Sequence, residues 1–232
     1  MNKPMKLILA VVGVAVLLVA GGVAFWALND SAEDEFELSS TETTEGSGEE
    51  TDTAEAPAAG GTWTVAEGSE AGYRIDEELR GLQKTATART DDVSGELTLD
   101  GAEVTDASVV VMLEGLTSDA EQRDSRVRDN YLETDQFPEA TFTLSGPLEL
   151  TGEPEVGVPV SVEATGTLDL HGVTNDVTVQ IDAQLTAADQ MEVIGSTPIA
   201  LADYDIEVPD IGGFVKSAPE GTLEFKLQLT PA

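Results

Sequence analysis

Few residues of this chain have side chains suited to catalysis or metal binding. His171 is the single histidine, and the chain has no cysteine, which excludes disulfides, thiolate nucleophiles and cysteine-based zinc sites. A lone histidine placed before Gly172, between two strand patterns, is more typical of a residue that holds a turn through a ring hydrogen bond. The alternative is an enzyme in which His171 is the general base and Asp169 its orienting partner, although no serine lies in a nucleophile-elbow motif.

Four acidic residues lie close together in the sequence near the C-terminus. They are Asp203, Asp205, Glu207 and Asp210. Carboxylates are ligands that calcium prefers, but these residues lack the Asp-x-Asp-x-Asp-Gly spacing of a calcium-binding loop. We interpret the segment as a solvated loop, and the sequence predicts no metal site and no cofactor.

The chain is strongly acidic. Its 232 residues include 45 Asp and Glu against 11 Lys and Arg, which gives a formal net charge of -34. Such a surface repels phosphate backbones, so we expect no nucleic-acid partner. The hydrophobic content of 41% is sufficient for a core, and the length suits one folded domain with appendages.

The C-terminal half alternates between apolar and polar residues with a period of two. The alternation is strict in residues 177–185 and again in residues 222–230. Strands with one apolar face must close into a sandwich or a barrel to bury that face. Strands are predicted at 72–76, 82–89, 93–99, 107–113, 140–150, 158–170, 173–185, 191–202 and 221–230.

One helical pattern interrupts the predicted strands. Ser118 and Glu121 have the spacing of a capping box, and Val127 and Tyr131 lie four residues apart, which places them on one helix face. The sequence therefore predicts one short helix that caps or flanks the sheet.

The N-terminal part differs in composition from the rest. Residues 1–6 carry two lysines, and residues 7–28 contain no charge and are long enough to cross a hydrocarbon layer of about 30 Å. We expect an uncleaved transmembrane signal anchor at 7–28, with residues 1–6 in the cytoplasm. Residues 29–61 are predicted to form a disordered acidic linker, so the folded domain at 62–232 is expected on the extracytoplasmic side of the cell membrane.

Three motifs in the middle of the chain follow one another in a specific order. They are a helix containing Arg123 and Asp124, a Phe137-Pro138 step into a strand, and a Gly-x-Leu-x-Leu-His-Gly-Val-Thr turn at 166–174. This order resembles the YceI-like family of polyisoprenoid-binding proteins, and the resemblance spans residues 62–232. The opening segment at 73–90 departs from the family pattern, because it lacks the usual histidine and resembles a variant with arginine and glutamate.

The resemblance implies an all-β, antiparallel, lipocalin-like barrel of about eight strands whose lumen takes an isoprenoid tail. An eight-stranded barrel is either filled by its own side chains or able to hold one small ligand, and the strand pattern leaves both open. For each candidate lumen residue, ordinary core packing is the alternative. The candidates are Val109, Val111, Leu113, Phe142, Leu144, Val177, Val179, Ile181, Phe225 and Leu227.

Basic residues are scarce enough that a cluster of them suggests a role. We hypothesise that Arg123 and Arg126 lie at the barrel mouth and hold a phosphate or a quinone head group through charge-assisted hydrogen bonds. The alternative is that they pair with the surrounding carboxylates.

The sequence and the resemblance together favour a membrane-tethered binding or carrier protein for an isoprenoid lipid, such as an isoprenoid quinone or a polyprenyl phosphate, and not an enzyme. The main alternative is a surface interaction module with a solid core. A His171-dependent hydrolase is less favoured.

Overall fold

The structure, a computed structural model, describes residues 33–39, 60–152, 154–207, 210–211 and 215–232. The predicted anchor at 7–28 lies outside the described residues, as does the predicted linker at 29–61 apart from residues 33–39 and 60–61. In the part of the chain that is described, no helix is both long enough and apolar enough to cross a membrane.

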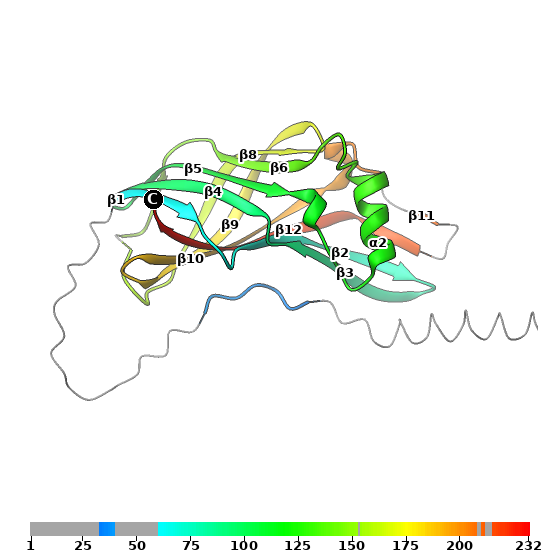
Figure 1. The fold of residues 1–232 in the computed structure, drawn as a ribbon, viewed down its shortest axis with the longest axis horizontal. Helices are drawn as coiled ribbons and strands as arrows, with labels where there is room; N and C mark the ends of the chain where they lie inside the picture. The colour runs from blue at the N-terminus through cyan, green and yellow to red at the C-terminus, as the bar shows by residue number, and fades with distance from the viewer. Residues whose placement is uncertain (1–32, 40–59, 153, 208–209, 212–214) are drawn as a thin grey trace, which may run out of the picture. The chain divides into compact units, whose positions relative to one another are not determined.

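A closed antiparallel β-barrel makes up most of the described chain (Figure 1). Within the described residues its eight strands follow the order β1, β4, β5, β6, β8, β9, β10 and β12, and pairing of β1 with β12 closes the ring. The bounds are β1 Gly60–Val65, β4 Val93–Asp100, β5 Glu103–Met112, β6 Glu139–Leu144, β8 Val160–Leu170, β9 Val173–Ala187, β10 Gln190–Ala200 and β12 Val215–Pro231.

A hairpin of β2 (Glu70–Leu79) and β3 (Leu82–Thr90) extends the wall beside β12. The long β12 pairs with β1 through its last residues, 229–231, and with β2 over residues 215–226. Two short strands pair at the margins, β7 (Leu148–Glu149) with β5 and β11 (Asp210–Ile211) with β12.

The two rims of the barrel differ. The helix rim carries α2 (Glu121–Arg126) and the β8–β9 turn, and the C-terminal rim carries the β4–β5 and β9–β10 turns and the end of β12 (Figure 1). The other short helical segments are η1 (Leu113–Gly115), η2 (Val127–Tyr131) and η3 (Leu201–Tyr204).

The predicted flanking helix is confirmed, but the predicted capping box is wrong. Ala120 is the N-cap and offers no side-chain cap. Ser118 instead bonds to the buried carboxylate of Asp124, which accepts its backbone N–H at 3.1 Å and also its hydroxyl. The partner of Ser118 is therefore one turn farther along the helix than Glu121.

The all-β prediction and the antiparallel barrel are confirmed, and each predicted strand corresponds to an observed one. The predicted strand 140–150 ends early, at Leu144, because Gly146 and Pro147 interrupt it, and pairing resumes only in β7. The predicted strand 191–202 ends at Ala200, where the chain turns into η3.

Period-two alternation sends apolar residues inward, where they form two clusters along the barrel. Trp63, Leu185, Met191 and Leu229 belong to the cluster near the C-terminal rim, and Leu168, Leu170 and Tyr204 to the cluster near the helix rim. In the middle of their strands, Gly166 and Gly195 make room for aromatic rings. A Cβ at Gly166 would lie 2.3 Å from the ring of Phe142, and one at Gly195 would lie 2.2 Å from the ring of Phe225.

Gly195→Ala is expected to lower the free energy of unfolding by about 1–3 kcal/mol, because the added methyl group forces the Phe225 ring to shift in a packed interior. Gly146→Ala is the matched control, since a Cβ there meets nothing within 4 Å, and its effect should stay within about 0.5 kcal/mol. Chemical denaturation of both variants tests this. Equal midpoints would contradict the packing of Phe225 over Gly195.

Candidate functional site

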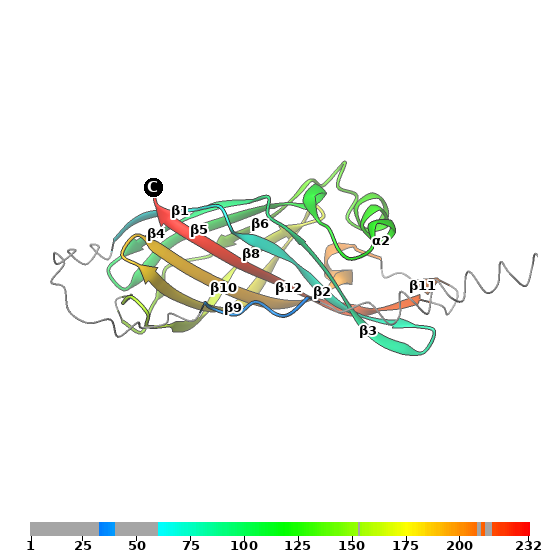
Figure 2. The same ribbon diagram turned by 60° about the horizontal axis from the view of Figure 1, so that its bottom comes forward.

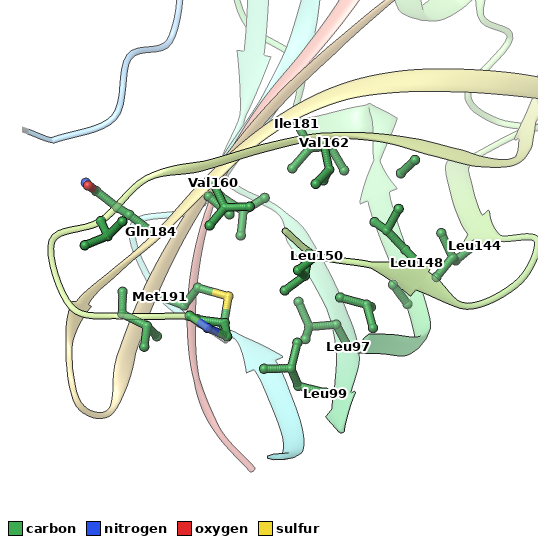
Figure 3. Close-up of a pocket in the computed structure, with 18 of the residues that line it drawn as sticks. Leu97, Leu99, Leu144, Leu148, Leu150, Val160, Val162, Ile181, Gln184 and Met191 are labelled. Carbon is green, nitrogen blue, oxygen red and sulfur yellow. The ribbon is translucent and has the colours of Figure 1, made fainter. Parts of the chain in front are cut away.

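An apolar cavity lies inside the barrel near the C-terminal rim (Figure 3). Its volume is about 100 Å³, and the surface exposed in it is entirely apolar. It is lined by Leu97, Leu99, Val104, Ala107, Phe142, Leu144, Leu148, Leu150, Pro154, Val158, Val160, Val162, Ala164, Ile181, Ala183, Gln184, Leu185, Met191 and Val193. In Figure 3, the side chain of Gln184 points away from the other labelled residues.

Strand alternation places most of the lining. Val160, Val162 and Ala164 are alternate residues of β8, and Leu97 and Leu99 are alternate residues of β4, so each set points to one face. The remaining wall comes from β5, β6, β9 and β10. A dry, wholly apolar lining of this kind holds hydrocarbon and offers no hydrogen bond to a polar group.

The connection between β6 and β8, residues 145–159, supplies the outer part of the cavity lining. It contributes Leu148, Leu150 and Val158, the last of which is 48% exposed. Beyond the pairing of β7 with β5, backbone hydrogen bonds fasten it at scattered points: the N–H of Leu150 donates to the carbonyl of Ala102 and that of Gly157 to the carbonyl of Leu185, both at 2.8 Å, and that of Ser145 to the carbonyl of Thr165 at 3.1 Å. A segment paired as a strand over only two residues opens at a lower free-energy cost than the long strands around it.

The candidate lumen residues predicted from the sequence fall into separate places. Phe142, Leu144 and Ile181 line the cavity. Three more, Val109, Phe225 and Leu227, pack in or against the apolar cluster near the C-terminal rim but do not line the cavity. The cluster near the helix rim takes Val111, Leu113 and Val177. Val179 is buried.

Sequence reasoning missed most of the lining. The alternation of 93–99 and 158–170 held the signal for Leu97, Leu99, Val160 and Val162, because both segments were predicted as strands. Leu148 and Leu150 share the period-two phase of Phe142 and Leu144 in the predicted strand 140–150, so the alternation held the signal for them too. The contribution of Val158 depends on how the segment before β8 bonds to distant backbone groups.

Arg123 and Arg126 lie on α2 at the helix rim, whereas the cavity lies near the C-terminal rim. Arg123 is paired, with its guanidinium 2.6 Å from the carboxylate of Asp119 and 4.0 Å from that of Glu77. Arg126 is exposed. The arginines proposed to hold a head group are therefore not next to the cavity that would hold a tail.

Tyr73 lies beside Arg123. Burial is the main reason why the pKa of its hydroxyl is raised. The positive charge of Arg123 lowers this pKa, and the carboxylates of Asp124 and Glu77 raise it further. Burial also raises the pKa of Tyr204. Both tyrosines stay protonated at neutral pH, so the polar groups at this rim present no phenolate.

His171 occupies the β8–β9 turn in the left-handed conformation, with φ of 55°. Its Nδ1–H donates to the carbonyl of Tyr204 at 2.9 Å, and its Nε2 lies 3.2 Å from the carboxylate of Glu133. The ring also meets Phe137 edge to face, with centroids 4.6 Å apart. These contacts join the turn to η3 and to the segment after η2. Among the described residues no group of His, Asp and Glu is arranged to hold a metal ion.

The turns at the C-terminal rim are acidic. Asp100 and Glu103 pair across the β4–β5 turn, Glu149 pairs with Glu103, and Glu155 and Asp189 lie exposed on neighbouring loops. The rim nearest the cavity therefore carries carboxylates.

Comparison with known proteins agrees with this architecture. The YceI-like domain model matches residues 63–229. The chain belongs to the YceI-like family. The resemblance noted in the sequence is thereby confirmed.

Relatives of this YceI-like chain include two bacterial proteins that match it over alignments of similar length. It is 29% identical over 137 residues to a UPF0312 protein of Vibrio campbellii, covering 55% of this chain and 68% of the relative. It is 30% identical over 132 residues to a UPF0312 protein of Shewanella baltica, covering 53% of this chain and 65% of the relative.

Solved structures share the YceI-like fold. A polyisoprenoid binding domain from Saccharophagus degradans has a TM-score of 0.57 at 22% identity, covering 73% of this chain and 98% of that one. BcnA of Burkholderia cenocepacia has a TM-score of 0.51 at 16% identity, covering 68% of this chain and 95% of that one. Similarity at these identities shows the fold.

His171→Ala is expected to lower the free energy of unfolding by about 1–3 kcal/mol, because it removes the ring hydrogen bond to Tyr204 and the ring contact with Phe137 while the strain at positive φ remains. His171→Gly removes the same ring but relieves the backbone strain, so it should cost about 1 kcal/mol less. Denaturant midpoints measure both effects. A His171→Ala protein as stable as the wild type would show that the ring does not hold the turn.

Proposed function

We propose that this YceI-like domain binds an isoprenoid lipid and buries the apolar tail inside the barrel. The observation that carries the proposal is the wholly apolar cavity, which offers a tail contact without any polar partner. The likeness to the S. degradans polyisoprenoid binding domain supports the same ligand class. A cavity within the described wall favours a carrier over an interaction module with a solid core.

The size of the cavity limits how a tail is held. An apolar cavity of about 150 Å³ is enough for benzene, so 100 Å³ takes only a short stretch of hydrocarbon. Each further buried CH₂ contributes roughly 0.8 kcal/mol, which favours widening of the cavity around a longer tail. The 145–159 segment is the part of the lining that we expect to move, because only the two residues of β7 are paired as a strand in it.

The charges at the rim favour a neutral head group. The carboxylates of Asp100, Glu103 and Glu155 would repel a phosphate leaving the cavity on this side, and Arg123 lies at the other rim. Of the two ligand types expected from the sequence, a quinone or an alcohol head fits this rim better than a polyprenyl phosphate.

Binding without chemistry is the function we infer. Nδ1 of His171 donates to a backbone carbonyl and Nε2 faces Glu133, which accounts for the ring as part of a turn. The histidine also lies at the helix rim, far along the strands from the cavity lining of Leu99 and Met191.

Membrane attachment is part of the same proposal. Residues 7–28 would anchor the chain in the cell membrane, with residues 62–232 on the extracytoplasmic side. An anchor raises the effective concentration of the domain at the bilayer that contains its ligand.

Ala183→Leu should weaken binding of a prenyl alcohol by about tenfold or more, because the larger side chain occupies the space of several methylene groups. Ala202→Leu is the control, since Ala202 is exposed at the helix rim. Native mass spectrometry of the purified full chain with added prenyl alcohol gives both affinities. Thermal unfolding must show that Ala183→Leu stays folded. If it does and binds as the wild type does, the tail is not held in this cavity.

A prenyl alcohol should bind more tightly than the prenyl phosphate of equal length at low salt, and the difference should shrink as ionic strength rises. Parallel titrations of the full chain at two salt concentrations measure the difference. Tighter binding of the phosphate would contradict the neutral head group while leaving tail binding intact.

A further inference from the structure

Residues 34–39, called the strap from here on, lie along the outside of the barrel beside β9 and β10 (Figure 2). The predicted linker includes these six residues, and the structure shows them in contact with the barrel wall. Phe36 and Leu38 are half-buried, whereas the residues between and around them are exposed. This alternation is that of an extended peptide with one face on a surface.

One end of the strap is held at Glu192 of β10. The Ser39 N–H donates to one oxygen of the Glu192 carboxylate at 2.7 Å, and the Ser39 hydroxyl donates to the other at 3.0 Å. The same carboxylate accepts bonds from Lys226 at 2.7 Å and from Gln228 at 3.1 Å. Its residue is 0% exposed although it lies on the outer face of the barrel. A buried carboxylate needs several donors, and the strap supplies two of them.

The other end of the strap is held at Arg89 of β3. The guanidinium lies 3.8 Å from the centroid of the Phe36 ring and donates to the carbonyl of Asp34 at 2.5 Å. Glu224 fixes the guanidinium through a 2.8 Å ion pair. Gly72 lies between Arg89 and Glu224 in the strand register, so no side chain separates them.

The barrel also recognises the backbone of the strap. Lys226 donates to the carbonyl of Glu37 at 3.2 Å, and Gln184 donates to the carbonyl of Ser39 at 2.7 Å. With Arg89, three side chains from three strands therefore bind three carbonyls of an extended segment. These bonds hold the strap through its backbone, so they recognise its extended conformation independently of its side chains.

We propose that the outer face formed by Gln184, Glu192, Lys226 and Arg89 is a binding surface for an extended acidic peptide, and that the chain covers it with its own strap. This surface selects phenylalanine by stacking on the guanidinium and a serine three residues later by its two bonds to Glu192. Two of the 11 basic residues of the chain, Arg89 and Lys226, bind the backbone of Asp34 and Glu37, so positive charge lies beside acidic residues of the strap.

The docked strap changes what the tether does. If residues 7–28 anchor the chain, only residues 29–33 separate the anchor from the first docked residue, compared with residues 29–61 in an undocked linker.

The electrostatics of Glu192 set the pH range of docking. Burial alone raises its pKa, but the hydrogen bonds from Lys226, Ser39 and Gln228 outweigh burial and lower the pKa from 4.5 to about 2. Lys226 and Gln228 belong to the barrel and bond Glu192 with or without the strap, so only the two Ser39 bonds distinguish the docked from the undocked state. These bonds favour docking while Glu192 is ionised and lose this effect when acid protonates the carboxylate.

The test is the exchange rate of the Ser39 amide hydrogen in the purified full chain, measured by NMR. We expect Phe36→Ala and Glu192→Gln each to speed this exchange by roughly tenfold or more, the factor expected for loss of one charge-assisted contact. Glu35→Gln is the control within the strap, because Glu35 is exposed, and Glu163→Gln is the control on the barrel, where Glu163 bonds to Gln180. Both controls should leave the rate unchanged.

A second measurement protects the test against misfolding of the Glu192→Gln barrel. A labelled synthetic peptide with the sequence of residues 33–40 should bind the full-length Phe36→Ala chain more tightly than a scrambled peptide does, and binding should weaken when Arg89 is also replaced by methionine. Ser39 exchange at the rate of a free peptide in the wild type would overturn the proposal. Protection that rises with protein concentration would overturn docking within one chain and assign the strap to a second copy.

Discussion

The structure depends on one constraint, the pairing of β1 with β12 that closes the sheet. Trp63, Thr64 and Val65 of β1 align with Pro231, Thr230 and Leu229 of β12, so the first and last strands of the domain meet. Once the ring is closed, each strand has an inside and an outside, and a period of two decides where every residue points. The apolar interior and the charged exterior both follow from this closure. Pairing of strands so distant in sequence is favourable only because the interior is buried at the same time.

The sequence predicted the parts of the structure that depend on local pattern. The strands around Ile181 and Phe225 follow strict alternation, and their inward residues are partly buried in the interior. Selecting which inward residues border the cavity was not possible, because Phe225 fills the space over Gly195 whereas Ile181 faces the space that remains. That difference arises from packing across the lumen between strands far apart in sequence. The pairing of Ser118 with Asp124 was missed for a local reason, because the capping-box spacing fits Glu121 equally well.

Charge and apolar surface are separated along and across the barrel. The C-terminal rim combines the apolar cavity with carboxylates such as Asp100 and Glu103, while the arginines of α2 lie at the helix rim and Arg123 is paired with Asp119. A hydrocarbon tail can enter an apolar cavity through an acidic rim if its head carries no negative charge. The same acidity repels anionic surfaces, so it limits unselective association of a protein that has an apolar cavity.

The strap and the cavity use opposite faces of the same strands. Gln184 and Glu192 contact the strap from outside, while their sequence neighbours Ala183, Leu185, Met191 and Val193 line the cavity. Strands β9 and β10 pair Glu192 with Gln184 in register, so Ser39 bridges two strands directly behind the cavity wall. A wall bonded on its outer face resists spreading, whereas the 145–159 segment is paired as a strand only over the two residues of β7 and is otherwise joined by scattered backbone bonds. The docked strap therefore directs any widening of the cavity toward that segment, which is the side where the rim is acidic and where Val158 is exposed.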